Sequence, residues 1–411
     1  MIPLVVSAFL LLAASPLAAQ DRPRIIQARS KVVTIIDGQH EKKDYWYIMP
    51  ERSPEVYFAE LPRAPHRVTF VTDLDSVSFD VTYGSRHAFV IQLADGTLAP
   101  TEIRAEYRRL LPYRRLSTGA SDEPDLIPFT LGDNDKIYVT GSINGGPVLA
   151  LQVDLGAGGN LIKKASVSKV TMTFDESITL RNSDGEHAVP ASSRNTIDIA
   201  GLRWEDVPIA VADNMTRREE GIVGNTLFQD RIVTIDYDRM VLAIHDTLPD
   251  VSGWQRADMI LDGVVPFIRG ELEAGRHRQS GWFMLDTGAY TSILRHERLS
   301  KSSKFRDELE RLLGRPGGDV RGPVVSFGNQ MFSGFNYAVT PYEGRPSDLG
   351  MLGNDLLKRL NIVVDNRLGS AYVRPNRRAN DGFRNPERLV VRTVAIVGLV
   401  AAAAASYRRL R

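Results

Sequence analysis

The sequence predicts an all-β protein made of two similar halves that follow a smaller β domain. Two turns rich in small residues each place an aspartate after an apolar strand, at Asp154 and at Asp286. An apolar-apolar-glycine segment follows each turn at a similar distance, and short alternating patterns typical of strands fill the region before the first turn. Together these observations indicate an internal repeat, which decides the fold class more firmly than any single motif.

The composition is that of an ordinary globular chain. Its 411 residues are 43% hydrophobic and 25% charged, which allows two or three domains. A net charge of +1, from 51 basic and 50 acidic residues, gives no electrostatic reason to expect a nucleic-acid partner. Because the chain has no cysteine, disulfides, thiolate metal sites and cysteine nucleophiles are excluded.

Residues 1–19 are predicted to be a signal peptide. Residues 2–14 are almost wholly apolar, and residues 15–19 supply the helix break and small side chains expected before a cleavage near Ala19. No lysine or arginine precedes Arg22, which keeps an uncleaved N-terminal anchor open as the alternative. We therefore expect an exported protein of the periplasm or cell envelope.

The C-terminal residues 379–411 are predicted to be a linker followed by a membrane anchor or sorting segment. Residues 393–407 are apolar or small and are bracketed by arginines. A helix over this stretch reaches about 22 Å, short of a hydrocarbon core of about 30 Å. We expect membrane association, with a packed amphipathic tail and a sorting signal removed after export as the alternatives.

Residues 20–125 are predicted to be a small N-terminal β domain. Strand patterns occur at 68–71, 77–81 and 89–93, and a turn dipeptide follows at Asp95 and Gly96. No acid, base and nucleophile stand together at a readable spacing, so a structural or docking role is expected. Residues 117–128, rich in Ser, Gly, Asp and Pro, are the expected linker.

The two halves, predicted as domains 126–250 and 251–378, repeat two motifs in the same order. The apolar-apolar-glycine segments end at Gly224 and at Gly353, and each leads into a closing strand. The separation is 70 residues from Asp154 to Gly224 and 67 residues from Asp286 to Gly353. Chance similarity seldom preserves order, spacing and two motifs at once.

Over residues 129–376 each half resembles a lobe of the pepsin and retropepsin superfamily, and the pair resembles a bilobal bacterial aspartic peptidase. This resemblance implies two β-barrel lobes with a central cleft. It carries over Asp154 and Asp286 as the catalytic dyad, and no metal or organic cofactor is required. The residues that would support the two active-site loops are Gly156, Ala157, Thr287, Gly288 and Ala289.

The chemistry of two adjacent carboxyl groups favours the same function. Two carboxylates a few ångströms apart do not both ionise readily, so the pair offers an acid and a base together. A water molecule between them can be activated to attack a peptide carbonyl. The resemblance therefore implies an exported aspartic endopeptidase acting on a peptide or protein substrate.

Leu155 departs from the family pattern, because it stands where the second loop has Thr287. In the family this hydroxyl joins hydrogen bonds that tie the two loops together, so part of that network must be absent or replaced. Two alternatives stay open. The fold has lost hydrolysis and binds a peptide or an envelope polymer, or the second lobe alone is competent and pairs Asp286 with Asp286 of another chain.

A β-hairpin at 178–189 is the candidate for the flap that covers a peptide cleft in this family. Its tip residues Ser183, Asp184 and Gly185 are candidate substrate contacts, and the Asp184-Gly185 dipeptide suits a tight turn. An exposed structural hairpin is the alternative. The seven histidines form no H-E-x-x-H pair or other compact zinc spacing, so no metal site is expected.

Overall fold

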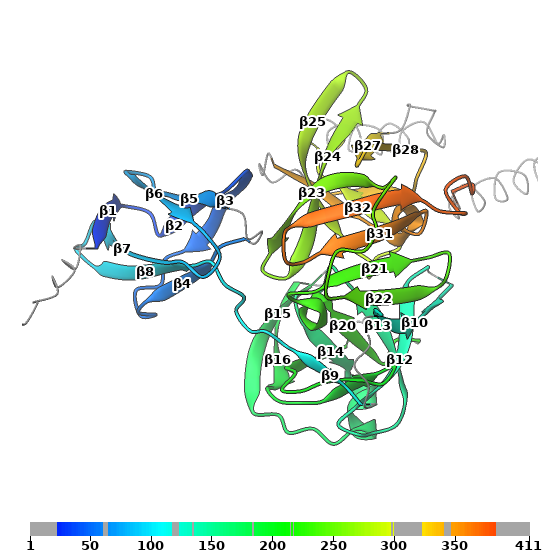
Figure 1. The fold of residues 1–411 in the computed structure, drawn as a ribbon. Coiled ribbons are helices and arrows are strands. Elements are labelled where there is room, and N and C mark those ends of the chain that lie inside the picture. The colour runs from blue at the N-terminus through cyan, green and yellow to red at the C-terminus, as the bar shows by residue number, and fades with distance from the viewer. Residues whose placement is uncertain are drawn as a thin grey trace, which may run out of the picture.

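The structure is a computed structural model that describes residues 23–60, 65–116, 123–133, 135–182, 185–213, 215–216, 218–296, 299, 323–340 and 347–383. The predicted signal peptide lies outside these residues, as does the stretch 393–407. No helix among the described residues is long and apolar enough to cross a bilayer. The all-β prediction is confirmed, since strands dominate every part of the described chain (Figure 1).

The N-terminal domain consists of two four-stranded sheets that enclose a core of their own. Their orders are β1-β7-β8-β4 and β3-β2-β5-β6. Alternate residues of each strand point inward, and the fully buried Phe70 and Phe89 rings meet edge to face at 4.9 Å. The strands are β1 (Arg24–Ala28), β2 (Val32–Asp37), β3 (His40–Tyr47), β4 (Glu55–Phe58), β5 (His66–Val71), β6 (Ser76–Val81), β7 (Arg86–Leu93) and β8 (Leu98–Arg104).

The first lobe folds mainly from one mixed sheet, in which β13 runs parallel to β20 and β14 runs antiparallel to it. Its elements are β9 (Tyr113–Arg115), β10 (Asp125–Pro128), β11 (Thr130–Leu131), β12 (Ile137–Ile143), β13 (Leu149–Asp154), β14 (Asn160–Lys163), η1 (Lys164–Lys169), β15 (Glu176–Asn182), β16 (Gly185–Ser192), β17 (Ile197–Ile199), β18 (Leu202–Trp204), β19 (Ile209–Ala212), β20 (Gly221–Gly224), η2 (Asn225–Phe228), β21 (Ile232–Asp236) and β22 (Val241–His245).

The second lobe repeats this pattern, with β25 parallel to β30 and β26 antiparallel to β30. Its elements are β23 (Gln255–Asp262), β24 (Val265–Ala274), β25 (His277–Leu285), β26 (Ser292–Leu294), β27 (Val324–Phe327), β28 (Gln330–Ser333), β29 (Tyr337–Val339), β30 (Asp348–Leu352), α2 (Asn354–Leu357), β31 (Leu360–Asp365) and β32 (Ser370–Pro375).

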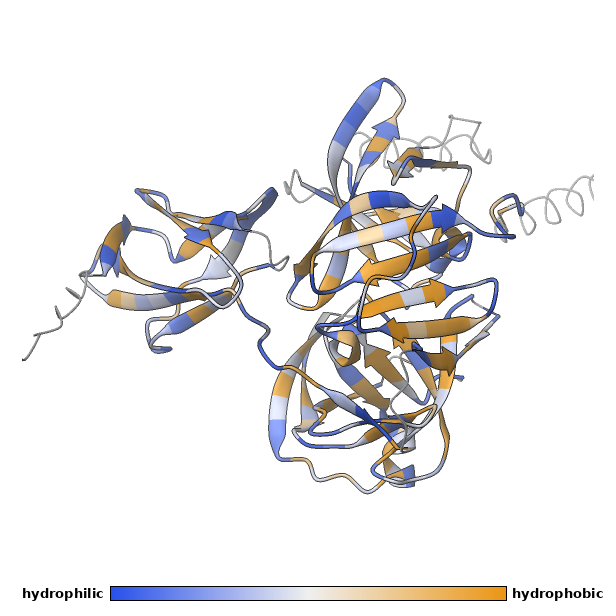
Figure 2. Cartoon of the chain, viewed as in Figure 1, coloured by the Kyte–Doolittle hydropathy of each residue, from blue (hydrophilic) through white to orange (hydrophobic). Residues whose placement is uncertain are grey.

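The closing hairpins of the two lobes join into one sheet between them, in the order β10-β22-β21-β31-β32-β23. β21 and β31 pair antiparallel, with Thr234 opposite Val363. The central strands β22, β21 and β31 are largely apolar, and they lie where the two lobes meet (Figures 1 and 2). Each hairpin turn is held by an equivalent aspartate, because Asp236 accepts from the N–H of Asp238 and Asp365 accepts from the N–H of Arg367. Buried apolar residues of both lobes belong to one cluster, so a single core runs through the two lobes and the sheet that joins them.

The expected linker at 117–128 is wrong for its last four residues, which form strand β10 and pair with β22. An edge strand tolerates Pro128, and Asp125 accepts hydrogen bonds from Tyr113 and Arg115 at 2.6 Å each. Strand β9 also pairs with β18, so the chain joins the first lobe before residue 125. A polar composition alone does not distinguish such an edge strand from a linker.

Candidate active site

Asp154 and Asp286 occupy equivalent places in the two lobes. Asp154 ends β13, and Asp286 directly follows β25. In each loop the glycine two residues later donates its backbone N–H to the aspartate: Gly156 to Asp154 Oδ1 and Gly288 to Asp286 Oδ1, both at 2.8 Å. The two loops therefore have the same local geometry, which is what the repeat in the sequence implies.

The fold brings the two carboxyl groups together, since a Cβ atom placed on Gly156 would lie 3.0 Å from Oδ1 of Asp286 and 3.2 Å from Oδ1 of Asp154. A Cβ atom placed on Gly156 would lie 2.8 Å from Cγ of Asp286, and one placed on Gly288 would overlap the carboxyl group of Asp154. Any larger residue at these positions would push the pair apart. Both aspartates keep part of their surface accessible to solvent, so a water molecule can reach them.

Burial raises the pKa of both carboxyl groups above the ordinary aspartate range. For Asp154 the charge of Asp286 adds to this effect and the pKa lies well above the usual value. The N–H groups of the glycines and the positive charge of Lys136 oppose the rise. Because like charges at this distance do not both form readily, the pair is set up to hold one proton.

Thr287 ties the two loops together. Its hydroxyl donates to the carbonyl oxygen of Val153 and accepts from the N–H of Leu155, both at 2.9 Å, and the residue is fully buried. Leu155 is also buried but has no hydroxyl with which to return these bonds. The hydrogen bonds expected from the second loop to the first are therefore present. Those expected from the first loop to the second are replaced by apolar packing of Leu155.

The segments that follow pass behind the loops, as the resemblance implies. A Cβ atom on Gly224 would lie 2.6 Å from the carbonyl oxygen of Ala157, and one on Gly353 would lie 2.6 Å from that of Tyr290. The next residue differs in its role between the lobes. Asn354 donates to the carbonyl oxygen of Thr287 at 2.6 Å, whereas Asn225 donates to that of Val264 at the same distance.

The faces of the lobes that carry the aspartates differ in chemistry. Along β13 and β25, residues that point into the core alternate with residues on the face that carries the aspartates. On that face lie Gln152 in the first lobe and Met284 in the second. These pair across the ladder with Tyr138 and Phe267 respectively. We call these surfaces the first and second dyad faces. The first is polar and the second is apolar.

The N-terminal domain rests on the second dyad face. His40 packs against Phe267 and Trp282, with ring centroids 5.8 and 6.5 Å apart. Lys42 is almost fully buried and forms ion pairs with Glu60 and Asp262, each at 2.8 Å. No sequence pattern signals this contact, because residues more than two hundred positions apart provide it.

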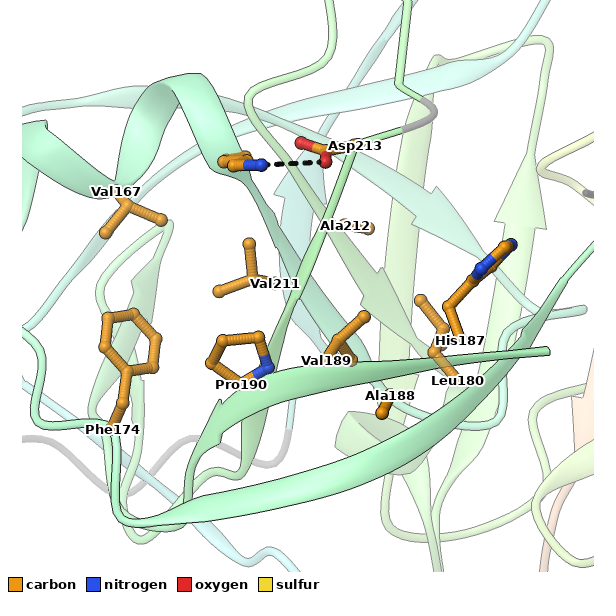
Figure 3. A pocket seen from close by; sticks show the side chains of 11 residues that line it. Val167, Phe174, Leu180, His187, Ala188, Val189, Pro190, Val211, Ala212 and Asp213 are labelled. Atoms are coloured by element: carbon orange, nitrogen blue, oxygen red, sulfur yellow. Dashed lines mark hydrogen bonds and ion pairs between the residues drawn. The ribbon is translucent and has the colours of Figure 1, made fainter.

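The flap candidate is a hairpin of β15 and β16 in which Asn182 pairs with Gly185. The hairpin predicted at 178–189 is confirmed, and Gly185 opens β16; the predicted tip residues Ser183 and Asp184 lie outside the described residues. A largely apolar pocket of about 580 Å³ lies along this hairpin. Figure 3 shows Val189 and Pro190 near Val211, with Phe174 at one end of the pocket and His187 at the other.

Within the described parts of the chain, no group of three or more His, Asp or Glu side chains is arranged to hold a metal ion. Sequence reasoning missed Gln152, Tyr138 and Lys136 as members of the site. The available signal was the strand period of two, which places Gln152 on the same face as Asp154.

Residues 139–227 match the family model described as aspartyl protease, which covers most of the first lobe. The crystal structure of aspartic proteinase from Irpex lacteus is similar at 11% identity and a TM-score of 0.47, covering 64% of this chain and 100% of that chain. The search of curated proteins found no match.

Proposed function

We propose that this chain, whose first lobe is of the aspartic peptidase superfamily, hydrolyses internal peptide bonds with Asp154 and Asp286 as its catalytic residues. The main support is the close approach of these two carboxyl groups, which come from equivalent loops of one chain. A structural role alone would not need two carboxyl groups in contact.

The chemistry follows from the shared proton. The ionised carboxylate takes a proton from a water molecule while the water oxygen attacks the amide carbon. The protonated partner donates to the carbonyl oxygen, which gives a neutral tetrahedral intermediate. The amide nitrogen then receives a proton, the carbon–nitrogen bond breaks, and a carboxylic acid and an amine are released. Burial of the pair strengthens each of these interactions.

The pocket along β15 and β16 supports a preference for apolar substrate side chains. Phe174, Val189 and Val211 line it, and the ion pair of Lys164 and Asp213 at 3.2 Å lies at its edge. An apolar side chain that enters this space would be removed from water on several sides. Export and association with a membrane remain our expectation for the compartment, from the sequence of the two ends.

The test uses the full chain on a diverse peptide mixture in water enriched in oxygen-18, from acid to neutral pH. We expect new internal termini, with one heavy oxygen in each new carboxyl group at the first cleavage. Replacement of either Asp154 or Asp286 by Asn is expected to reduce cleavage by about 10³-fold. Binding of peptides without cleavage by the folded wild type would contradict the proposal and identify a binding protein, as the buried Leu155 allows.

A further inference from the structure

Lys136 is a charged residue of the first dyad face that the proposed mechanism does not use. It directly precedes β12, and the strand alternation puts it on the same face as Tyr138, opposite the core residue Ile137. The equivalent position in the second lobe is Val265, two residues before Phe267 as Lys136 is two residues before Tyr138. At this pair of equivalent positions, the first lobe therefore has a positive charge and the second an apolar side chain.

A short chain of hydrogen bonds connects Lys136 to the dyad. Its ammonium group donates to Gln152 Oε1 at 3.2 Å, and Gln152 Nε2 lies 3.5 Å from Asp154 Oδ2. Lys136 donates to Gln152 and Gln152 donates to the carboxyl group of Asp154, so this arrangement favours the ionised form of Asp154. The Lys136 side chain is 17% exposed, which limits screening by solvent.

The same ammonium group forms an ion pair with Glu219 at 2.9 Å. Glu219 is 2% exposed and also accepts from Tyr138 and from the N–H of Thr216. Burial alone would raise the pKa of Glu219, but the bonds from Lys136 and Thr216 hold it below its usual range. Glu219 is therefore a fixed negative charge that opposes the effect of Lys136 on the dyad.

We propose that Lys136 is a positioning residue which, through Gln152, sets the pH range in which Asp154 and Asp286 share one proton. This inference rests on the proposed function. Among the described residues, the charged and titratable groups that face it include Glu219 from the segment before β20, Tyr138 on β12 and the dyad itself. The guanidinium of Arg218 lies 4.6 Å from the Tyr138 ring centre.

The sign follows from elementary electrostatics. A positive charge stabilises the ionised forms, so it lowers the pKa of both carboxyl groups and moves both limbs of the activity profile to lower pH. Removal of Lys136 should therefore move the profile to higher pH, and removal of Glu219 should move it to lower pH. A pair that only fastened the segment before β20 to β12 would give no such opposite shifts.

The experiment measures kcat/KM against pH for the full chain, together with the titration of the carboxyl carbons of Asp154 and Asp286 by carbon-13 NMR. For Lys136→Met we expect both curves to move up by about one pH unit. For Glu219→Gln we expect a downward shift, and for Lys136→Arg a profile near that of the wild type. Arg114→Met, which removes an exposed cation paired with Glu205 in the same lobe, should leave the profile unchanged.

Two results would overturn the inference. One is an unchanged carboxyl titration in folded Lys136→Met. The other is a shift in the same direction for Lys136→Met and Glu219→Gln. If the wild type cleaves no peptide, the proposed function fails while the NMR titration still decides whether Lys136 acts on the pair.

Discussion

The two active-site loops share one backbone geometry, but only the second loop provides a side chain that hydrogen-bonds to the other loop. The Thr287 hydroxyl of the second loop makes two hydrogen bonds to the backbone of the first loop. The Leu155 side chain, at the equivalent position, cannot hydrogen-bond to the second loop. The second loop is itself fastened from behind by Asn354, while Asn225 is turned toward the second lobe instead. A two-fold arrangement of carboxyl groups therefore does not require a two-fold hydrogen-bond network.

The surfaces around the loops differ in the same sense. The first dyad face carries Lys136, Tyr138 and Gln152, whereas the second carries Val265, Phe267 and Met284 and supports the N-terminal domain. The charged first dyad face adjusts the ionisation of the dyad, and the apolar second dyad face provides the surface on which the N-terminal domain docks.

The largest expected effect is on the contact between the second lobe and the N-terminal domain. Lys42→Met should lower the free energy of unfolding by about 3–5 kcal/mol, because it leaves Glu60 as a buried carboxylate without its ammonium partner. Chemical denaturation measures this loss. The exposed neighbour on the same strand provides the control, and Lys43→Met should change stability by less than about 0.5 kcal/mol. Equal effects would show that burial of Lys42 is not what stabilises the contact.

The next largest effect is expected at the hydroxyl that joins the loops. Thr287→Val should lower stability by about 1–3 kcal/mol, because two buried backbone groups lose their partner. It should also lower kcat by about tenfold or more through displacement of the aspartates. The control in the other loop is Leu155→Val, which should cost about 1 kcal/mol by packing alone and leave kcat nearly unchanged. Equal effects of the two substitutions on kcat would contradict the claim that the Thr287 hydroxyl, and not the Leu155 side chain, positions the aspartates.

The raised pKa of Asp154 predicts how stability depends on pH. A carboxyl group whose pKa is higher in the folded state contributes most below about pH 3.9, and its contribution is lost as the pH rises through the folded pKa. Asp154→Asn cannot ionise, so its melting temperature should exceed that of the wild type by more at pH 7 than at pH 4.

Asp238 provides the opposite control for this prediction. Burial alone would raise its pKa, but hydrogen bonds from Arg377 and Asn361 hold it below the usual range. Its contribution is therefore present above about pH 3.9, and Asp238→Asn should lose stability relative to the wild type as the pH rises. Thermal melts that show the same pH trend for both variants would contradict the assignment of the raised pKa to the dyad.

The smallest effect is expected from restoring symmetry. Leu155→Thr should add a hydroxyl that can hydrogen-bond to the second loop and so raise kcat by about two- to fivefold, which corresponds to a net hydrogen bond of about 0.5–1 kcal/mol. Steady-state kinetics measures the change. Leu155→Val again provides the control, because it shortens the side chain without adding a hydroxyl; a gain of the same size in Leu155→Val would mean that relief of packing is responsible.

The sequence predicted what is encoded locally and missed what long-range contacts decide. The loops at Asp154 and Asp286 and the segments ending at Gly224 and Gly353 were readable because each needs particular small residues within a few positions. The pairing of Lys136 with Glu219 and the docking of Lys42 on Asp262 were not readable, since ion pairs across 83 and 220 positions leave no periodic pattern. The flap hairpin was readable because its two strands are separated by a short polar segment and pair with each other.

The most direct test of a single site built from both lobes compares cleavage by the wild type, by Asp154→Asn, by Asp286→Asn and by an equal mixture of the two variants. If the two aspartates of one chain form the site, both variants are inactive, their mixture stays inactive, and wild-type activity per molecule does not depend on protein concentration. Activity of Asp154→Asn that increases with protein concentration would contradict this claim and place the active site between the second lobes of two chains.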